Sequence, residues 1–355
     1  MDVARLQTVV STGASPVQID AIVNPLYVVL GVVLLIALVV DLLWTTLWVD
    51  GGSGPLSARL ATGVWRVLRR LGRRHSRFLS LAGPFVLVLT LSMWIGLLWA
   101  GWTFVFAGGE YALIDTRNGG PADWSGRIYY VAYTMFTDGN GDFTPNGDIW
   151  EMASSFTTAS GMLVATLSVS YILSILGAVS QKRSFANGVT ALGMRSEAFL
   201  QSGWDGEDFT DLDLLLDTLS SDLNMLAEQH KSYPILHYYH SENETEASAM
   251  AVAILADAMF LLEVAVPDAN EPNEALTEST RSSVNDYLET LNNAFIQPAE
   301  QPPPPPNLDH LREADIPTVS DREFAEALAK REDSRRKLLG AVDADAWYWP
   351  SENLE

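Results

Sequence analysis

Long apolar runs dominate the first half of the chain, and amphipathic runs dominate the second half. Residues 22–49 are almost wholly apolar, residues 85–106 hold no charge, and residues 149–180 form a third long apolar run with interspersed Ser and Thr. Because a helix needs about 20 residues to cross a bilayer, each run predicts a transmembrane helix. Residues 122–136 are too short and too polar to span, which favours a re-entrant helix. Beyond the third run, helical amphipathic patterns lie near 185–201, 211–232, 246–265 and 277–296.

Charge separates the same two halves. Residues 1–180 carry 10 Lys and Arg against 11 Asp and Glu, whereas residues 181–355 carry 12 against 33. An apolar membrane half is therefore followed by an acidic, helical, cytosolic half. The chain has no Cys, which excludes disulfides and thiolate metal sites. High acid content with only four Lys suits a cytoplasm with molar salt and predicts a halophilic source, a plain acidic tail being the alternative.

The linker over residues 50–80 holds seven of the 22 basic residues of the chain. By the positive-inside rule it is cytoplasmic, so the N-terminus lies outside and the acidic half lies in the cytosol. A voltage sensor also repeats Arg along a helix, but paired arginines and the lack of preceding sensor helices favour an interfacial helix that binds anionic headgroups. The arginines predicted to bind headgroups are Arg66, Arg69, Arg70, Arg73, Arg74 and Arg77.

These patterns predict six regions in order. An extracellular N-terminus over 1–21 precedes the first transmembrane helix over 22–49 and the Arg-rich linker over 50–80. The central region, 81–180, contains an outer helix over 85–106, a short helix over 122–136 and an inner helix over 149–180. The helical acidic domain covers 181–300. A Pro-rich linker and a C-terminal helix cover 301–355, and five consecutive prolines from Pro302 to Pro306 predict a stiff, extended spacer.

The segment between the short helix and the inner helix reads Thr-Asp-Gly-Asn-Gly-Asp over residues 137–142. Two glycines one residue apart allow backbone dihedral angles that other residues avoid. A backbone in that state can turn a row of carbonyls towards one axis, and such a row replaces the hydration shell of an ion in a cation filter. The pattern predicts a pore built round Thr137, Asp138, Gly139, Asn140, Gly141 and Asp142.

This segment resembles the pore loop of the potassium channel superfamily, whose signature is Thr-Val-Gly-Tyr-Gly-Asp followed shortly by Pro. Here Pro145 follows the six residues, and Gly161 falls where many inner helices carry a hinge glycine. The resemblance covers roughly residues 80–180 and is to two-helix channels of the prokaryotic type, with an additional N-terminal helix. It implies an all-α membrane protein with the tetrameric pore-loop fold. The residues implied to support the filter are Tyr129, Tyr130, Tyr133 and Thr134.

The resemblance further implies passive conduction through a homotetramer, with potassium favoured over sodium at the backbone carbonyls of residues 137–140. Two residues depart from the family pattern: Asp138 replaces Val and Asn140 replaces Tyr. In the family fold these side chains point away from the ion path, so the carbonyl row survives, but its stiffness and field change. Four copies each of Asp138 and Asp142 would repel anions. The resemblance predicts no enzyme activity, no resident cofactor and no nucleic-acid partner.

Two other interpretations compete with the cation pore. Asp138, Asn140 and Asp142 alternate like the ligands of a calcium-binding loop, but the required Gly is Phe143 and the closing Glu is replaced by Ile149. In the second interpretation the chain is a membrane-anchored sensor that has lost conduction and signals through its acidic half.

Three further features each allow two interpretations. Asp41 interrupts the first apolar run, either as a gating or packing contact or as a carboxylate at the cytosolic boundary. Small residues recur along the inner helix, either for helix packing or to face a water-filled cavity. These residues are Ser154, Thr158, Gly161, Ala165 and Ser168. Helix capping and packing are favoured over a metal site for a histidine cluster formed by His230, His237 and His240.

Overall fold

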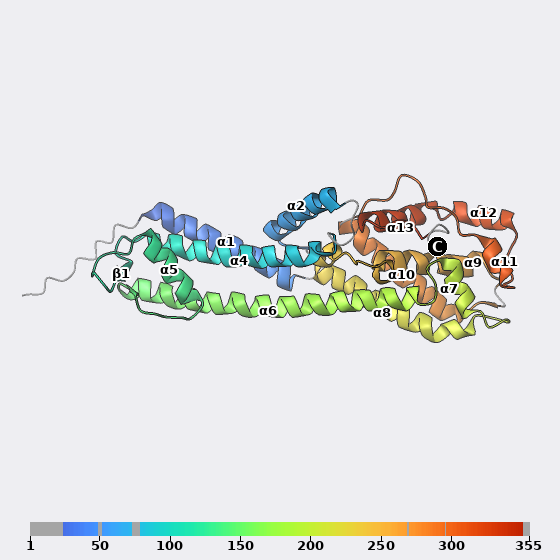
Figure 1. Ribbon diagram of the computed structural model, residues 1–355, viewed down its shortest axis with the longest axis horizontal. Coiled ribbons are helices and arrows are strands. Elements are labelled where there is room, and N and C mark those ends of the chain that lie inside the picture. The colour runs from blue at the N-terminus through green and yellow to red at the C-terminus, as the bar shows by residue number, and fades with distance from the viewer. Residues whose placement is uncertain (1–23, 49–51, 73–78, 268–269, 295, 351–355) are drawn as a thin grey trace, which may run out of the picture. The chain divides into compact units, whose positions relative to one another are not determined.

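The computed structural model describes residues 24–48, 52–72, 79–267, 270–294 and 296–350 (Figure 1). The predicted extracellular segment, residues 1–21, and three of the predicted headgroup-binding residues, Arg73, Arg74 and Arg77, lie outside these ranges. Contacts divide the chain into two compact units. The first unit contains residues 1–38 and 95–165, and the second contains residues 39–94 and 166–355.

Four of the described helices are long and apolar enough to cross a membrane. Three of them match the predicted runs: α1 (Pro25–Leu47), α4 (Ala82–Ala107) and α6 (Asp148–Thr190). All three expose large apolar side chains, among them Val29, Phe85 and Leu163, as expected of helices that face lipid. The fourth candidate, α9 (Ser248–Ala265), was expected to be amphipathic, and this expectation is wrong. Fifteen of its 18 residues are buried, because other helices surround it.

The first unit holds the short helix and a small sheet in addition to parts of α1, α4 and α6. The short helix α5 (Trp124–Met135) is shorter by three residues than predicted. Asp123 is its N-cap residue, and the Asp123 carboxylate accepts from the Gly126 N–H at 2.7 Å. A carboxylate at this position satisfies a free N–H of the first turn and favours the helix start. Two strands, β1 (Leu113–Asp115) and β2 (Phe143–Pro145), pair antiparallel on either side of α5 in sequence.

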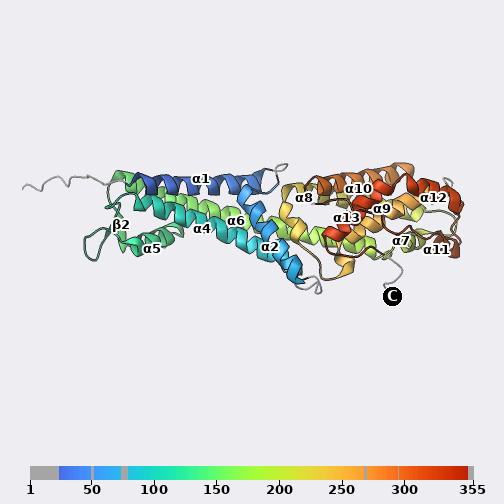
Figure 2. The ribbon, with the colours of Figure 1, turned by 90° about the horizontal axis from the view of Figure 1, so that it is seen from above.

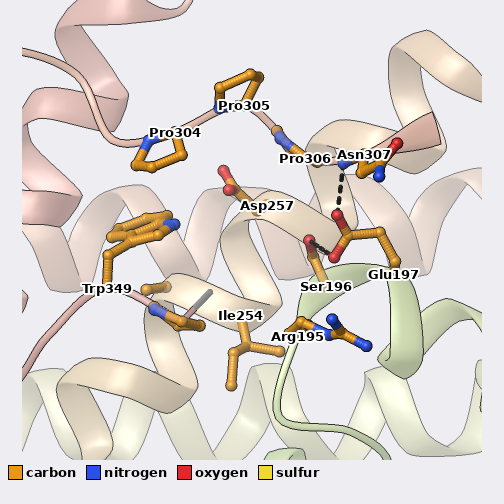
Figure 3. Close-up of a pocket in the computed structure, with 12 residues that line it drawn as sticks. Arg195, Ser196, Glu197, Ile254, Asp257, Pro304, Pro305, Pro306, Asn307 and Trp349 are labelled. Carbon is orange, nitrogen blue, oxygen red and sulfur yellow. Dashed lines mark hydrogen bonds between the residues drawn. The ribbon is translucent and has the colours of Figure 1, made fainter. Parts of the chain in front are cut away.

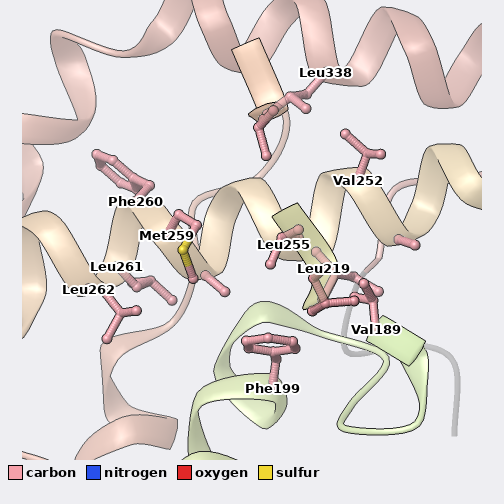
Figure 4. Packing of buried hydrophobic residues seen from close by; sticks show 14 of the residues in the cluster. Val189, Phe199, Leu219, Val252, Leu255, Met259, Phe260, Leu261, Leu262 and Leu338 are labelled. Atoms are coloured by element: carbon pink, nitrogen blue, oxygen red, sulfur yellow. The ribbon is translucent and has the colours of Figure 1, made fainter. Parts of the chain in front are cut away.

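The second unit is a helical domain packed around α9. Besides parts of α1, α4 and α6, it contains α2 (Pro55–Gly72), α7 (Ser196–Gly203), α8 (Asp213–Ser232), α10 (Glu274–Ala294), α11 (Leu308–Glu313), α12 (Asp321–Ala329) and α13 (Glu332–Ala344). Three 3₁₀ helices join them: η1 (Thr210–Leu212), η2 (Pro234–Tyr238) and η3 (Glu244–Glu246). In two views α9 lies among α7, α10 and α13 (Figure 2). Its side chains Leu255 and Met259 pack with Phe199 and Leu219 from α7 and α8 (Figure 4).

The five consecutive prolines lie along this domain. Pro303 and Pro306 are buried. The guanidinium of Arg335, itself buried, donates to the Pro303 and Pro304 carbonyls at 3.1 and 2.7 Å. Proline carbonyls are free acceptors in an extended run without internal hydrogen bonds, so the run is held to α13 through its backbone.

Asp41 is fully buried in the second unit and forms a packing contact. Its carboxylate accepts from the N–H groups of Leu56 and Ser57 at 2.7 and 3.1 Å, and from the indole Nε1 of Trp94 at 2.9 Å. Leu56 and Ser57 belong to the first turn of α2. Asp41 therefore caps α2 from another helix and stabilises its positive end. A Cβ at Gly54 would overlap this carboxylate, so the sharp turn into α2 requires glycine.

The apolar side of α2 packs on η2. Trp65 is buried and its ring contacts His237 and Tyr238 at centroid distances of 6.3 and 6.0 Å. Arg59, Arg66, Arg69 and Arg70 remain exposed on the helix, and Arg69 donates to the Asp343 carbonyl at 2.9 Å. Beyond residue 180, the predicted end of the inner helix, α6 continues to Thr190. The buried Lys182 finds acceptors there, the Leu236 and Tyr239 carbonyls at 3.3 and 2.9 Å.

The three histidines of the predicted cluster contact different groups. His230 donates from Nδ1 to the Leu226 carbonyl at 2.9 Å and meets the Tyr287 ring edge-on. His237 contacts Trp65, and His240 stacks on Trp347 with its Nδ1 3.5 Å from Asp345. Burial lowers the pKa of His230 to about 3 and that of His237 to about 4, so both rings are neutral at physiological pH. The three rings thus pack separate parts of the domain.

Candidate functional site

The segment predicted to bind ions leaves α5 through two backbone hydrogen bonds. The N–H of Thr137 donates to the Thr134 carbonyl at 3.1 Å, and the N–H of Asp138 donates to the Tyr133 carbonyl at 2.8 Å. These bonds satisfy carbonyls that the end of a helix otherwise leaves free. They also fix the direction in which the chain leaves the helix, and the residues from Thr137 to Gly141 are exposed in the single chain.

The backbone of this segment alternates in handedness. Thr137, Gly139 and Gly141 have positive φ angles of 64°, 58° and 80°, and the residues between them do not. A chain that alternates in this way places successive carbonyls on one side and successive N–H groups on the other. Positive φ is costly for a residue with a Cβ, so Thr137 is held there by its surroundings. This alternation is the backbone geometry that the predicted carbonyl row of a cation filter requires.

Side chains of α5 brace this segment from behind. The Tyr130 hydroxyl donates to Ser154 Oγ on α6, and the Tyr133 hydroxyl donates to the Phe143 carbonyl at 3.0 Å. The Asn140 amide Nδ2 donates to the Tyr129 hydroxyl. All four predicted supports, Tyr129, Tyr130, Tyr133 and Thr134, are thus brought together with the segment. The Asp138 carboxylate has no hydrogen-bond partner among the described residues of its own chain.

The sequence did not indicate a further clamp on the outer end of the segment. The strand β1 pairs with β2, so the residue after β1, Thr116, lies beside the end of the row. Its N–H donates to the Asp142 carbonyl at 3.0 Å. Its Oγ1 donates to the Asp142 and Gly141 carbonyls at 2.9 and 3.2 Å. Only a tertiary pairing of two three-residue strands brings Thr116 there, and the sequence pattern of such short strands is weak.

An ion pair fixes the same turn. The Arg117 guanidinium donates to both oxygens of Asp115 at 2.9 and 3.0 Å and lies over the Phe143 ring, 5.3 Å from its centroid. The hydrogen bond from Arg117 lowers the pKa of the Asp115 carboxyl below its ordinary value. Asp115 therefore stays ionised and the turn stays closed at neutral pH.

Some of the small residues that recur along α6 line a cavity, and others pack against neighbouring segments. Ser154 and Thr158 line a space of about 390 Å³ together with Thr137, Gly139 and Gly141. Gly161 is buried against the end of α5, where a Cβ would overlap the Met135 carbonyl oxygen. Further along the helix, Ala165 is exposed and Ser168 is buried.

Comparison with known proteins agrees with this geometry. The family described as "Ion channel" matches residues 85–178, which contain α5, the alternating segment and most of α6. The uncharacterized membrane protein YdjJ of Bacillus subtilis (strain 168) is 42% identical over 327 residues, 92% of this chain and 96% of the relative. The chain belongs to the pore-loop ion channel family. No solved structure matches the chain.

Membership of this family defines the parts of residues 85–178. The helices α4, α5 and α6 coincide with the segments predicted as the outer, short and inner helices of an ion channel domain. Channels of this family are generally not enzymes. The helix α1 is an addition that precedes the channel domain. We call residues 137–142 the filter segment from here on.

We expect Thr116→Val to weaken the outer end of the filter segment. Valine keeps the shape and the backbone N–H but removes the hydroxyl that donates to two carbonyls, and one hydrogen bond contributes about 1 kcal/mol. The potassium-to-sodium permeability ratio should fall severalfold in bi-ionic recordings, and Thr116→Ser should restore it. The matched control is Thr144→Val on exposed β2, which should change nothing. Equal ratios in all four proteins would exclude the clamp.

We expect Gly161→Ala to destabilise the ion channel domain. The added methyl meets a backbone carbonyl that no side-chain rotation can move, and such overpacking costs about 1–3 kcal/mol. The melting temperature of the detergent-purified protein should fall. The matched control is Gly177→Ala. Gly177 lies on the same helix, and its new Cβ would have no heavy atom within 4 Å, so the melting temperature should not change. The predicted hinge role gives a different result: altered gating in Gly161→Ala with an unchanged melting temperature.

Proposed function

We propose that this chain is one subunit of a homotetrameric channel that passes monovalent cations passively, with potassium favoured over sodium. The observation that carries the proposal is the alternation of positive φ at Thr137, Gly139 and Gly141. One chain supplies one row of carbonyls, and four rows must surround an ion to replace its water. Four-fold symmetry of identical chains supplies them.

The proposed mechanism follows from the groups along the row. An ion loses its water at the outer end, moves between carbonyl sites from Asn140 to Thr137, and leaves into the space beside α6. Each site binds weakly enough to release the ion to the next. The carboxylates of Asp138 and Asp142 raise the local cation concentration and repel anions. No group of the chain reacts with the ion, so conduction needs no cofactor.

The alternative is a membrane-anchored sensor on a channel scaffold that does not conduct. It is favoured by Asp138 and Asn140, which depart from the family signature. Purified protein in planar bilayers separates the two. A cation-selective current that reverses near the equilibrium potential of potassium supports the channel. Absence of any current in bilayers that contain correctly assembled tetramers would support the sensor.

We further propose that the N-terminus lies outside and that residues 181–355 lie in the cytosol. The arginines of α2 support this orientation through the positive-inside rule. The chain has no Cys, so a single cysteine introduced at residue 10 or at residue 70 is the only thiol that can be labelled. Its labelling shows on which side of the membrane that residue lies. We expect a membrane-impermeant thiol reagent to label residue 10 from outside and residue 70 only after permeabilisation. Labelling of both from one side would exclude this topology.

Anionic lipid is the proposed partner of α2. Arg59, Arg66 and Arg70 are exposed on this helix while Trp65 packs on the protein, so the charged side is free for headgroups. Native mass spectrometry of the purified protein tests the interaction. Replacement of Arg66 and Arg70 by Gln should reduce retained phosphatidylglycerol, and unchanged retention would exclude these two arginines as the site.

A further inference from the structure

A cavity of about 470 Å³ lies in the second unit, apart from the filter segment (Figure 3). It is enclosed by the start of α7, one side of α9, the proline run and the segment that follows α13. The residues that line it are Arg195, Ser196, Glu197, Ala253, Ile254, Asp257, Pro304, Pro305, Pro306, Asn307, Trp349 and Pro350. Its volume falls in the range of about 300–1,000 Å³ that is typical of small-molecule sites.

The two carboxylates of the cavity already have partners. Asp257 accepts from Arg335 through both oxygens, at 3.1 and 2.8 Å. Glu197 accepts from the Asn307 N–H at 2.6 Å through Oε1 and from the Ser196 hydroxyl at 3.2 Å through Oε2. A cationic ligand would have to compete with these bonds, which disfavours amines and metal cations here.

The charged side chain of the cavity that has no partner in the described part of the chain is a donor. Arg195 is half-buried, and its guanidinium has no acceptor among the described residues. Arg195 also occupies the N-cap position of α7 and offers the first turn no side-chain acceptor. The free N–H groups and the helix dipole favour an acceptor at this end, and the carboxylate in the same turn, Glu197, already accepts from the Asn307 N–H. Residues 181–355 carry 33 acids against 12 bases, so an arginine side chain without an acid partner is unusual in this half of the chain.

The opposite wall suits a flat ring. Trp349 faces the cavity from the side opposite Ser196 and Glu197, and the proline run borders the cavity between them (Figure 3). The Arg335 guanidinium lies 5.7 Å from the centroid of the Trp349 ring and helps to hold the indole in place. Indole rings stack on bases and other planar groups. A bare phosphate would leave this wall and most of the volume unfilled.

We propose that this cavity binds a small organic anion that carries a planar ring, of the size and chemistry of a mononucleotide. The ring lies against Trp349 and the prolines. The anionic group accepts from Arg195 and from the first turn of α7. Binding of a ligand to this cavity is measured without recording an ion current. A negative binding result would therefore contradict this proposal and not the proposed channel.

Isothermal titration calorimetry of the full-length, detergent-purified protein tests the proposal. The probes are adenosine monophosphate, adenosine and inorganic phosphate. We expect the nucleotide to bind at least about tenfold more tightly than either fragment, because only the nucleotide uses both walls. Absence of heat with the nucleotide at millimolar concentration would overturn the proposal, and so would equal affinity for all three probes.

Variants assign the two walls. Arg195→Gln and Trp349→Ala should each weaken nucleotide binding about tenfold or more, since each loses a charge-assisted hydrogen bond or a stacking surface. Trp349→Phe keeps a ring and should retain most of the affinity, which separates stacking from misfolding. The matched control is Arg322→Gln, an arginine of α12 whose side chain is 88% exposed. Equal weakening by Arg322→Gln would show only nonspecific charge attraction and would overturn the site.

Discussion

Gly141→Ala should abolish the cation current while leaving tetramers intact. Gly141 has φ of 80°, and an added Cβ would meet no heavy atom within 4 Å in its own chain. The effect therefore comes from the backbone: a residue with a Cβ pays about 1–2 kcal/mol in the left-handed region. Relaxation to negative φ would turn a carbonyl away from the row, and this would happen in every subunit. Planar bilayer recordings measure the current, and size-exclusion chromatography with light scattering measures assembly.

The matched control for this prediction is Gly119→Ala. Gly119 has φ of 73° and equally open space, but it lies in the turn after β1 and carries no carbonyl of the row. We expect the same local strain with normal conductance. Normal conductance in Gly141→Ala would mean that the filter segment is not the ion path. Loss of current in both variants would mean that strain anywhere in this loop region is enough, and the carbonyl argument would fail.

The order of elements in the ion channel domain was predictable from the sequence. Apolar runs of spanning length, a short polar helix between them and the Gly-x-Gly spacing are local properties of the chain, and each of them determines a local structure. The family match over residues 85–178 confirms the resemblance to pore-loop channels. The aromatic residues that lie near the filter segment were also identifiable, because they precede it by one or two turns on α5.

The contacts between distant segments were not predictable. The sequence gives no indication that Asp41 caps α2, that Thr116 bonds to the filter segment, or that Gly161 touches Met135. Each depends on where two elements meet in space. The error at α9 has a related cause: helical periodicity suggested an amphipathic helix, whereas neighbouring helices bury 15 of its 18 residues and Asp257 is paired with Arg335 from α13.

The last prediction concerns selectivity. We expect the channel to discriminate potassium from sodium less well than its relatives with the Thr-Val-Gly-Tyr-Gly-Asp signature. Asn140 lacks the large ring that acts as a strut in those relatives, and a looser row of carbonyls can contract round a smaller ion. Asp138 adds negative field behind the row, and stronger fields favour smaller ions. The relative size of these two effects depends on whether the fit of the ion between the carbonyls or the field strength of the carbonyls governs selectivity.

The structure supplies a partial brace at one of the two positions. Asn140 donates to the Tyr129 hydroxyl, so this side chain is tied to α5, although by one hydrogen bond in place of a packed ring. Asp138 is exposed, and its carboxylate has no partner among the described residues of its own chain. Tyr129→Phe removes the acceptor of Asn140 and keeps the ring. We expect this variant to lower the potassium-to-sodium permeability ratio further.

The double variant Asp138→Val with Asn140→Tyr separates a loose filter from a braced one. Restoring the apolar residue and the aromatic strut should raise the permeability ratio in bi-ionic recordings, about tenfold if the gain is near 1.4 kcal/mol. A different result is expected if Asp138 is a strut bonded across subunits. The unmodified channel would then already exclude sodium, and the double variant would do no better because it removes that strut while adding another. That pair of outcomes would make Asp138 a structural brace and exclude the loose-filter hypothesis.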